Sequence, residues 1–214
     1  MISFELITED KVPQFACSEC CKCNSKFGKS LCEYKNRGCC WYFPKFNLYD
    51  IQKMVKDKEG KKILDNIMKL PGVKIYNYYI HVKGFFDEKG YNEYLNSYEA
   101  YEDEMNDKSI YFRACPFVRD GEGCSLPAKY RSYVCNFYIC DEVIDKIGED
   151  KSYKEYIKER DSYVKWLEWE NEGLEAILKE KGINLINNFN KVIEVLEEIE
   201  EEDYEFVNLS KIEI

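Results

Sequence analysis

The sequence predicts a mainly α-helical protein with a small β component, in which a cysteine-rich loop lobe is organised around metal and amphipathic helices follow it. Three observations support this prediction. All eleven cysteines lie within the first 140 of 214 residues. Apolar residues recur at helical spacing between residues 152 and 202. A run of β-branched and aromatic residues at 73–86 is typical of strands.

The cysteines are expected to be reduced, and therefore to bind metal rather than to form disulfides. The first residues lack the basic start and apolar run of a secretory signal. No stretch approaches the ~20 apolar residues that cross a membrane. These features indicate a cytoplasmic protein, where thiols stay reduced. An odd number of cysteines also fits disulfide pairing poorly.

The first half of the chain is expected to contain loops, then a helix, then strands. Cys, Gly, Ser and Asn interrupt every candidate period in residues 12–46, which favours loops. Asn47 can cap a helix together with Asp50, and the helical pattern continues until a Pro-Gly pair at 71–72. One or two strands are expected over 73–86.

The segment that carries the later cysteines is expected to be largely extended. Residues 109–112 and 116–118 have extended character, and a polar Gly-containing turn follows them. Pro127 suits the first position of a helix that would carry Arg131 and Cys135.

The C-terminal part is expected to form two amphipathic helices, over 152–180 and about 185–202, with Gly182 ending the first. The chain then divides into a cysteine-cluster metal-binding domain, 1–145, and an acidic helical extension, 146–214, packed on or near it. Residues 141–214 hold 22 acidic and 10 basic side chains, so they carry the acidic excess of a chain whose net charge is −10.

The charge pattern argues against nucleic acid as a partner, because the sequence has no basic stripe to displace counterions from phosphate. Membranes are likewise not expected as partners. The expected partners are metal and, through the acidic helices, another protein.

Three early cysteines have the spacing of metal ligands. Cys17, Cys20 and Cys23 form a C-x2-C-x2-C run, which suits zinc and also matches three corners of a 4Fe–4S cube. A remote Cys-Pro can complete such a cube, and Cys115 precedes a proline. Together with an adjacent pair and three later cysteines, the candidate metal ligands are Cys17, Cys20, Cys23, Cys39, Cys40, Cys115, Cys124, Cys135 and Cys140.

The later cysteines carry a resemblance to a known family. The order Cys115-Pro-Phe-Val, Gly-Cys124-Ser-Leu, Arg131 and Cys135-Asn-Phe-Tyr is similar to the YkgJ, or CxxCxxCC, family of zinc- or iron-chelating cysteine-cluster domains. The chain departs from that family at Asn24, where the second cysteine of an early pair belongs. Cys39-Cys40 supplies such a pair after an insertion. The resemblance implies zinc or iron as the metal. The C-x2-C-x2-C run and the excess of thiolates over one tetrahedral site favour an iron–sulfur cluster, with 4Fe–4S favoured, over zinc.

Several roles stay open at this stage. Cys21 and Cys32 can be ligands or packed thiols, and His81, the only histidine, can be a ligand or a core residue. Arg131 can bond sulfur, bond carbonyls or lie at the surface.

Whether the chain is an enzyme is also open. Similarity of the later cysteines to flagellin lysine methylases makes an S-adenosylmethionine-dependent protein lysine N-methylase one alternative, although no Gly-rich nucleotide fingerprint is present. A metal-stapled interaction module is the other alternative.

Overall fold

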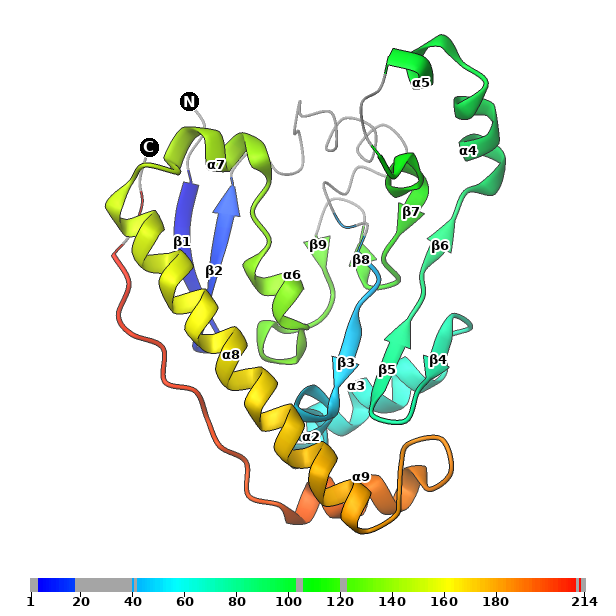
Figure 1. Cartoon of the computed structure of the whole chain (residues 1–214), viewed down its shortest axis with the longest axis vertical. Coiled ribbons are helices and arrows are strands. Elements are labelled where there is room, and N and C mark those ends of the chain that lie inside the picture. Colours follow the sequence, from blue (N-terminus) through cyan, green and yellow to red (C-terminus); the bar gives the residue numbers. More distant parts are fainter. Residues whose placement is uncertain are drawn as a thin grey trace.

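The computed structural model describes residues 4–17, 40, 42–102, 106–119, 123–210 and 212 of the chain. These residues are mainly helical with small antiparallel sheets, which confirms the predicted secondary-structure class. The long helix α8 (Lys151–Glu180) runs down the molecule, with a β-hairpin near its start and α9 near its end (Figure 1).

The other elements are short. The helices are α2 (Leu48–Lys56), α3 (Lys58–Met68), α4 (Glu88–Leu95), α5 (Tyr98–Glu102), α6 (Tyr133–Phe137), α7 (Asp141–Ile147) and α9 (Phe189–Glu198), with 3-10 turns η2 (Lys108–Phe112) and η3 (Ala128–Tyr130). The strands are β1 (Phe4–Glu9), β2 (Val12–Cys17), β3 (Lys45–Asn47), β4 (Val73–Ile75), β5 (Tyr79–Val82), β6 (Phe85–Phe86), β7 (Arg113–Ala114), β8 (Val118–Arg119) and β9 (Gly123–Cys124). They pair as β1-β2, β3-β5-β4, β6-β7 and β8-β9.

The predicted helix after Asn47 is present, but it is divided in two. The backbone N–H of Asn47 donates to the Asp50 carboxylate at 3.0 Å, as the capping pattern predicts. The chain then turns at Asp57, whose backbone is extended and whose side chain caps α3 by accepting from the N–H of Gly60 at 2.8 Å. The last turn of α2 is basic, with Lys53 and Lys56, and Asp57 follows as an acidic N-cap. This order of charges favours the end of one helix and the start of another over a single continuous helix.

The prediction of loops over 12–46 is wrong at both ends of that range. Residues 12–17 form β2, paired with β1, and residues 45–47 form β3. The hairpin turn is made by Asp10 and Lys11, both with positive φ (51° and 66°). Two-residue hairpin turns of this kind usually carry Asn-Gly or Asp-Gly, so the sequence gives no turn signal here.

The segment between β6 and α7 contains more helix and turn than the sequence predicts. Residues 109–112 belong to the 3-10 turn η2, which Asp107 caps through the N–H of Ser109 at 3.2 Å. Pro127 precedes η3 rather than opening a long helix, and Cys135 lies in the separate five-residue helix α6.

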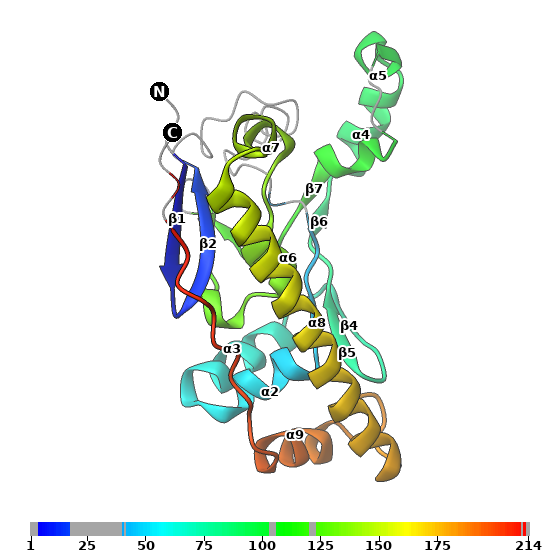
Figure 2. The ribbon, with the colours of Figure 1, turned by 60° about the vertical axis from the view of Figure 1, so that its left-hand side comes forward.

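The C-terminal part follows the prediction closely for α8, which ends before Gly182 at a φ of +65°. Helix α9 is shorter than the predicted 185–202. The main hydrophobic core joins α2, α3 and β5 with α8 and α9. The segment after α9 returns along α8 towards the hairpin (Figure 2). None of the helices in the described residues is long and apolar enough to cross a membrane.

Candidate functional site: a cluster of cysteines

The described residues include five cysteine side chains, those of Cys40, Cys115, Cys124, Cys135 and Cys140. The backbone of Cys17 closes β2 opposite Phe4. The remaining cysteines of the candidate set, Cys20, Cys23 and Cys39, lie outside the described residues, as do Cys21 and Cys32.

Local backbone geometry brings the first three of these side chains to one region. The N–H of Cys115 donates to the carbonyl of Cys40 at 3.1 Å, which ties the chain before β3 to the chain after β7. A tight turn follows, in which the N–H of Val118 donates to the Cys115 carbonyl at 3.3 Å. Val118 then pairs with Cys124 in the β8-β9 ribbon.

Helix α6 adds a fourth sulfur. Cys135 lies in its first turn, with its N–H donating to the Ser132 carbonyl at 2.8 Å. The pKa of its thiol is raised, chiefly by burial of the sulfur and then by the negative charge of three other cysteines. Those three are Cys115, Cys124 and Cys40, so the four sulfurs share one electrostatic environment. We call Cys40, Cys115, Cys124 and Cys135 the thiol cluster.

The thiol cluster is partly accessible. Cys40, Cys115 and Cys124 are half-buried, whereas Cys135 retains exposed surface. Protein atoms crowd the Cys135 sulfur enough to disfavour a thiolate there, although part of the residue faces solvent. Part of Cys135 is therefore accessible to an approaching ligand.

Cys140 has different neighbours. It precedes α7, where its carbonyl accepts from the N–H groups of Val143 and Ile144 at 3.0 and 3.1 Å. Its side chain packs against the small second core, which includes Val143, Ile147 and Tyr153. Cys115 and Cys124 instead pack against the main core.

The polar side chains of Tyr42 and Asn136 lie near Cys135 and form hydrogen bonds within the protein. The Tyr42 side chain hydrogen-bonds to Ser132, and its pKa is raised by burial and then by the charge of Cys135. Asn136 is buried and donates to the Ala128 carbonyl at 2.9 Å, but its Oδ1 has no partner among the described residues. The sequence offers no pattern that singles out Tyr42 or Ser132.

Arg131 bonds carbonyl and carboxylate oxygens rather than sulfur. Its Nε donates to the Leu126 carbonyl at 2.6 Å, and its Nη1 donates to Gln14 Oε1 at 2.7 Å. A longer contact of 3.4 Å joins Nη2 to Glu9. The guanidinium therefore ties the loop after β9 to the β1-β2 hairpin.

His81 lies within β5, between Lys45 on β3 and Lys74 on β4. Its ring hydrogen-bonds to the backbone of Phe43, and its pKa is lowered by burial and by these lysines. His81 therefore has one ring hydrogen bond to the chain just before β3 and lies among lysines that disfavour its protonated form.

No complete metal site is assembled in the part of the chain that the structure describes. There, no three or more His, Cys, Asp or Glu side chains are arranged so that they could hold a metal ion. The thiol cluster therefore does not form a metal site from the described side chains alone.

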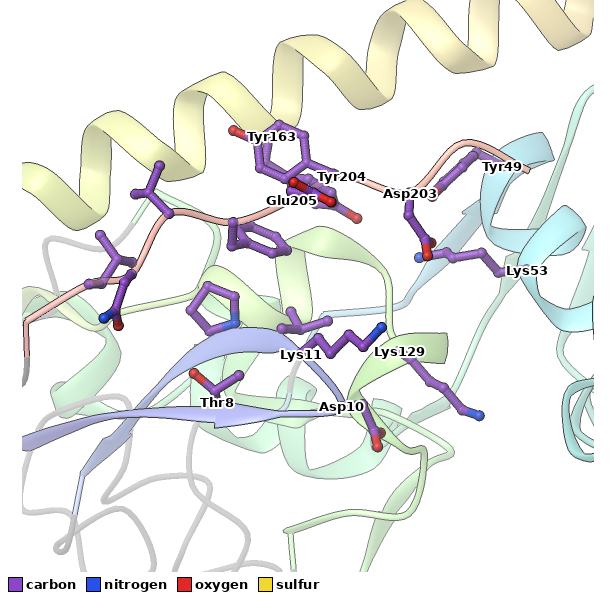
Figure 3. Close-up of a pocket in the computed structure, with 16 residues that line it drawn as sticks. Thr8, Asp10, Lys11, Tyr49, Lys53, Lys129, Tyr163, Asp203, Tyr204 and Glu205 are labelled. Atoms are coloured by element: carbon purple, nitrogen blue, oxygen red, sulfur yellow. The ribbon is translucent and has the colours of Figure 1, made fainter. Parts of the chain in front are cut away.

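A separate cavity of about 620 Å³ lies between the hairpin turn and the C-terminal segment beside α8 (Figure 3). Tyr163 and Tyr204 line it on one side, and Lys11 reaches in from the hairpin. Lys53 and Asp203 face each other at one end. None of the described residues that line this cavity is a cysteine.

Comparison with known proteins finds no matching family model, no similar curated protein and no similar solved structure. The function must therefore be inferred from the residues of this chain.

Proposed function

We propose that this protein is a cytoplasmic cysteine-cluster metalloprotein that binds an iron–sulfur cluster, with 4Fe–4S favoured, or zinc. The observation that carries the proposal is the gathering of Cys40, Cys115, Cys124 and Cys135 from three separate stretches of the chain. Nothing in ordinary core packing requires four thiols to lie in one partly exposed region.

The chemistry of these donors fits a soft or borderline metal. Thiolate is the ligand form of cysteine, and zinc and iron–sulfur clusters are its usual partners. Crowded thiols oppose one another's ionisation, as the raised pKa of Cys135 reflects. A bound cationic centre reverses that effect, because its positive charge stabilises every neighbouring thiolate.

The proposal needs further ligands, because the described residues hold no complete site. The proposed source is Cys17, Cys20 and Cys23, which have ligand spacing, together with Cys39, which adjoins Cys40. When bound, the metal centre would supply either a structural staple or a redox couple. The chain's own residues would position it through Tyr42, Ser132 and the turn at Cys115.

The direct test is anaerobic purification followed by measurement of iron, zinc and acid-labile sulfide. Iron and sulfide in equal amounts, with absorption near the visible band of iron–sulfur proteins, are expected. Stoichiometric zinc alone would support the zinc version instead. A protein that contains neither metal and does not take up either on reconstitution would overturn the proposal.

Cysteine-to-serine variants test which sulfurs are ligands. Cys115→Ser, Cys124→Ser and Cys135→Ser should each lower the bound metal by more than half. Ser125→Ala is the matched control, because Ser125 is exposed in the same loop and adjoins Cys124. Cys140→Ser, measured separately, distinguishes one centre from two, since Cys140 has its own packing environment.

A further inference from the structure

A second feature, distinct from the thiol cluster, is an arm formed by residues 85–102. Helices α4 and α5 project away from the rest of the molecule (Figures 1 and 2). We call residues 85–102 the aromatic arm. Ten large hydrophobic side chains are exposed in the described residues, and five of them lie on this arm: Phe85, Phe86, Leu95, Tyr98 and Tyr101. Such a concentration on one projection marks an interaction surface.

The inner face of the arm has its contacts within the molecule. Tyr91 and Tyr94 pack on the ring of Phe112 at centroid distances of 5.7 and 5.5 Å. Asp87 caps α4 by accepting from the N–H of Gly90 at 3.0 Å, and its own N–H donates to the Phe112 carbonyl at 2.9 Å. These contacts anchor the arm to η2.

The outer face of the arm carries large side chains that are exposed to solvent. No residue of α4 is buried, which is unusual for an eight-residue helix, because so short a helix is normally stabilised by packing. On α5, Ala100 is the buried residue, whereas Tyr98 is 73% exposed and Tyr101 is 87% exposed. These two tyrosines are three residues apart and so lie on one side of the helix.

The charge of the arm is strongly acidic. Residues 85–102 contain five acidic residues and one basic residue, a net charge of −4. Glu99 and Glu102 alternate with the two exposed tyrosines and are themselves exposed. In a dimer formed through two such arms, a net charge of −4 would face another net charge of −4. The electrostatic repulsion therefore disfavours an arm-to-arm dimer. The same carboxylates would repel phosphate.

We propose that the outer face of the aromatic arm binds a lysine- or arginine-rich segment of another protein. Ring faces of Tyr98 and Tyr101 attract cationic side chains, and Glu99 and Glu102 provide the opposite charge beside them. Leu95, 46% exposed, offers an apolar contact for the alkyl stems of those side chains. This role is independent of metal binding.

The probe is a fluorescein-labelled 12-residue peptide of repeated Arg-Lys-Leu, with a Glu-rich peptide of equal length for comparison. Fluorescence anisotropy should show that the full chain binds the basic peptide, that binding weakens with salt, and that the acidic peptide does not bind. Tyr98→Ser combined with Tyr101→Ser should weaken binding about tenfold. Tyr98→Phe with Tyr101→Phe should retain it.

The matched control is Trp169→Ser on α8. Trp169 is 68% exposed and lies between Glu168 and Glu170, so it offers the same chemistry away from the arm. Binding should be unchanged in this variant. No binding at low salt, equal losses in both serine variants, or self-association that the Tyr98/Tyr101 variant abolishes would each overturn the proposal. Metal content, measured on the same samples, reports separately on the thiol cluster.

Discussion

The backbone N–H of Cys115 lies 3.1 Å from the carbonyl oxygen of Cys40 and donates to it, although the two residues are 75 positions apart in the chain. This backbone bond positions two cysteine-bearing segments beside each other. The ribbon β8-β9 and the first turn of α6 bring Cys124 and Cys135 to the same region. Protein contacts thus supply part of the organisation that a metal would complete.

Removing metal should destabilise the protein through these positions. The free energy of metal binding contributes to folding when ligands come from distant segments. Incubation with a strong chelator should therefore lower the Tm of the metal-loaded protein, and the Tm of Cys124→Ser should fall much less. Differential scanning calorimetry measures both. An equal shift in the two proteins would show that Cys124 has no part in the metal-dependent stability.

Some of the fold was readable from the sequence because the signals were local. The capping pair Asn47 and Asp50, the long apolar stripe of α8 and the stop at Gly182 act within one or two turns of the chain. The hairpin turn could not be predicted from the sequence, because Asp10 and Lys11 adopt positive φ without the Asn-Gly or Asp-Gly pair that usually marks such a turn.

The sequence predicted which residues are candidates for the site, but not how they are arranged. Spacing marked cysteines as candidate ligands, but it contained no information on which of them lie near one another. The separate packing of Cys140 depends on α7 folding against Tyr153 of α8, which no cysteine spacing reveals. The roles of Tyr42 and Ser132 beside Cys135 likewise come from the folded chain.

Two glycines on helices should respond oppositely to alanine. A Cβ at Gly60 would lie 2.3 Å from the Met54 carbonyl oxygen, so Gly60→Ala should destabilise the protein by about 1–3 kcal/mol. A Cβ at Gly173 would meet nothing within 4 Å, so Gly173→Ala should stabilise it by about 0.5–1 kcal/mol. Urea unfolding of both variants checks this. A stabilising Gly60→Ala would show that α2 and α3 can separate freely.

Asp57 should make stability depend on pH in the acid range. Its pKa is lowered to about 2, first by the hydrogen bond from Tyr130 and then by the N–H of Gly60. Because the unfolded pKa is about 3.9, the stabilisation is complete above that value and is lost as the pH falls towards 2. The side chain of Asp57 is 44% exposed, so solvent screening limits the effect to about 1 kcal/mol.

The test of that dependence is Asp57→Asn, since Asn can still cap α3. Unfolding free energies between pH 2 and 5 should vary less in this variant than in the parent protein. Asp65→Asn is the control, because Asp65 is exposed on the same helix. Parallel pH profiles for Asp57→Asn and the parent would contradict the assignment.

Glu159 should be the main attachment point of the C-terminal segment to α8. Its buried carboxylate accepts from the Tyr204 hydroxyl at 3.0 Å and from the Val207 N–H at 3.1 Å. Burial and this hydrogen bond raise the pKa of Tyr204 to about 12. Glu159→Ala leaves both donors unpaired and should cost about 2–4 kcal/mol. Glu159→Gln keeps an acceptor oxygen and should cost less.

Glu155→Ala is the control for this change. Glu155 lies one turn earlier on α8 and, within the described part of the chain, forms only a surface ion pair with Lys151 at 3.6 Å, so its loss should cost under about 0.5 kcal/mol. Urea unfolding gives the free energies, and limited proteolysis reports whether residues 199–210 have come away from α8. If Glu159→Ala matched Glu155→Ala in both measurements, the segment would be held by its aromatic contacts, chiefly Tyr204 and Phe206 on Tyr163, rather than by the carboxylate.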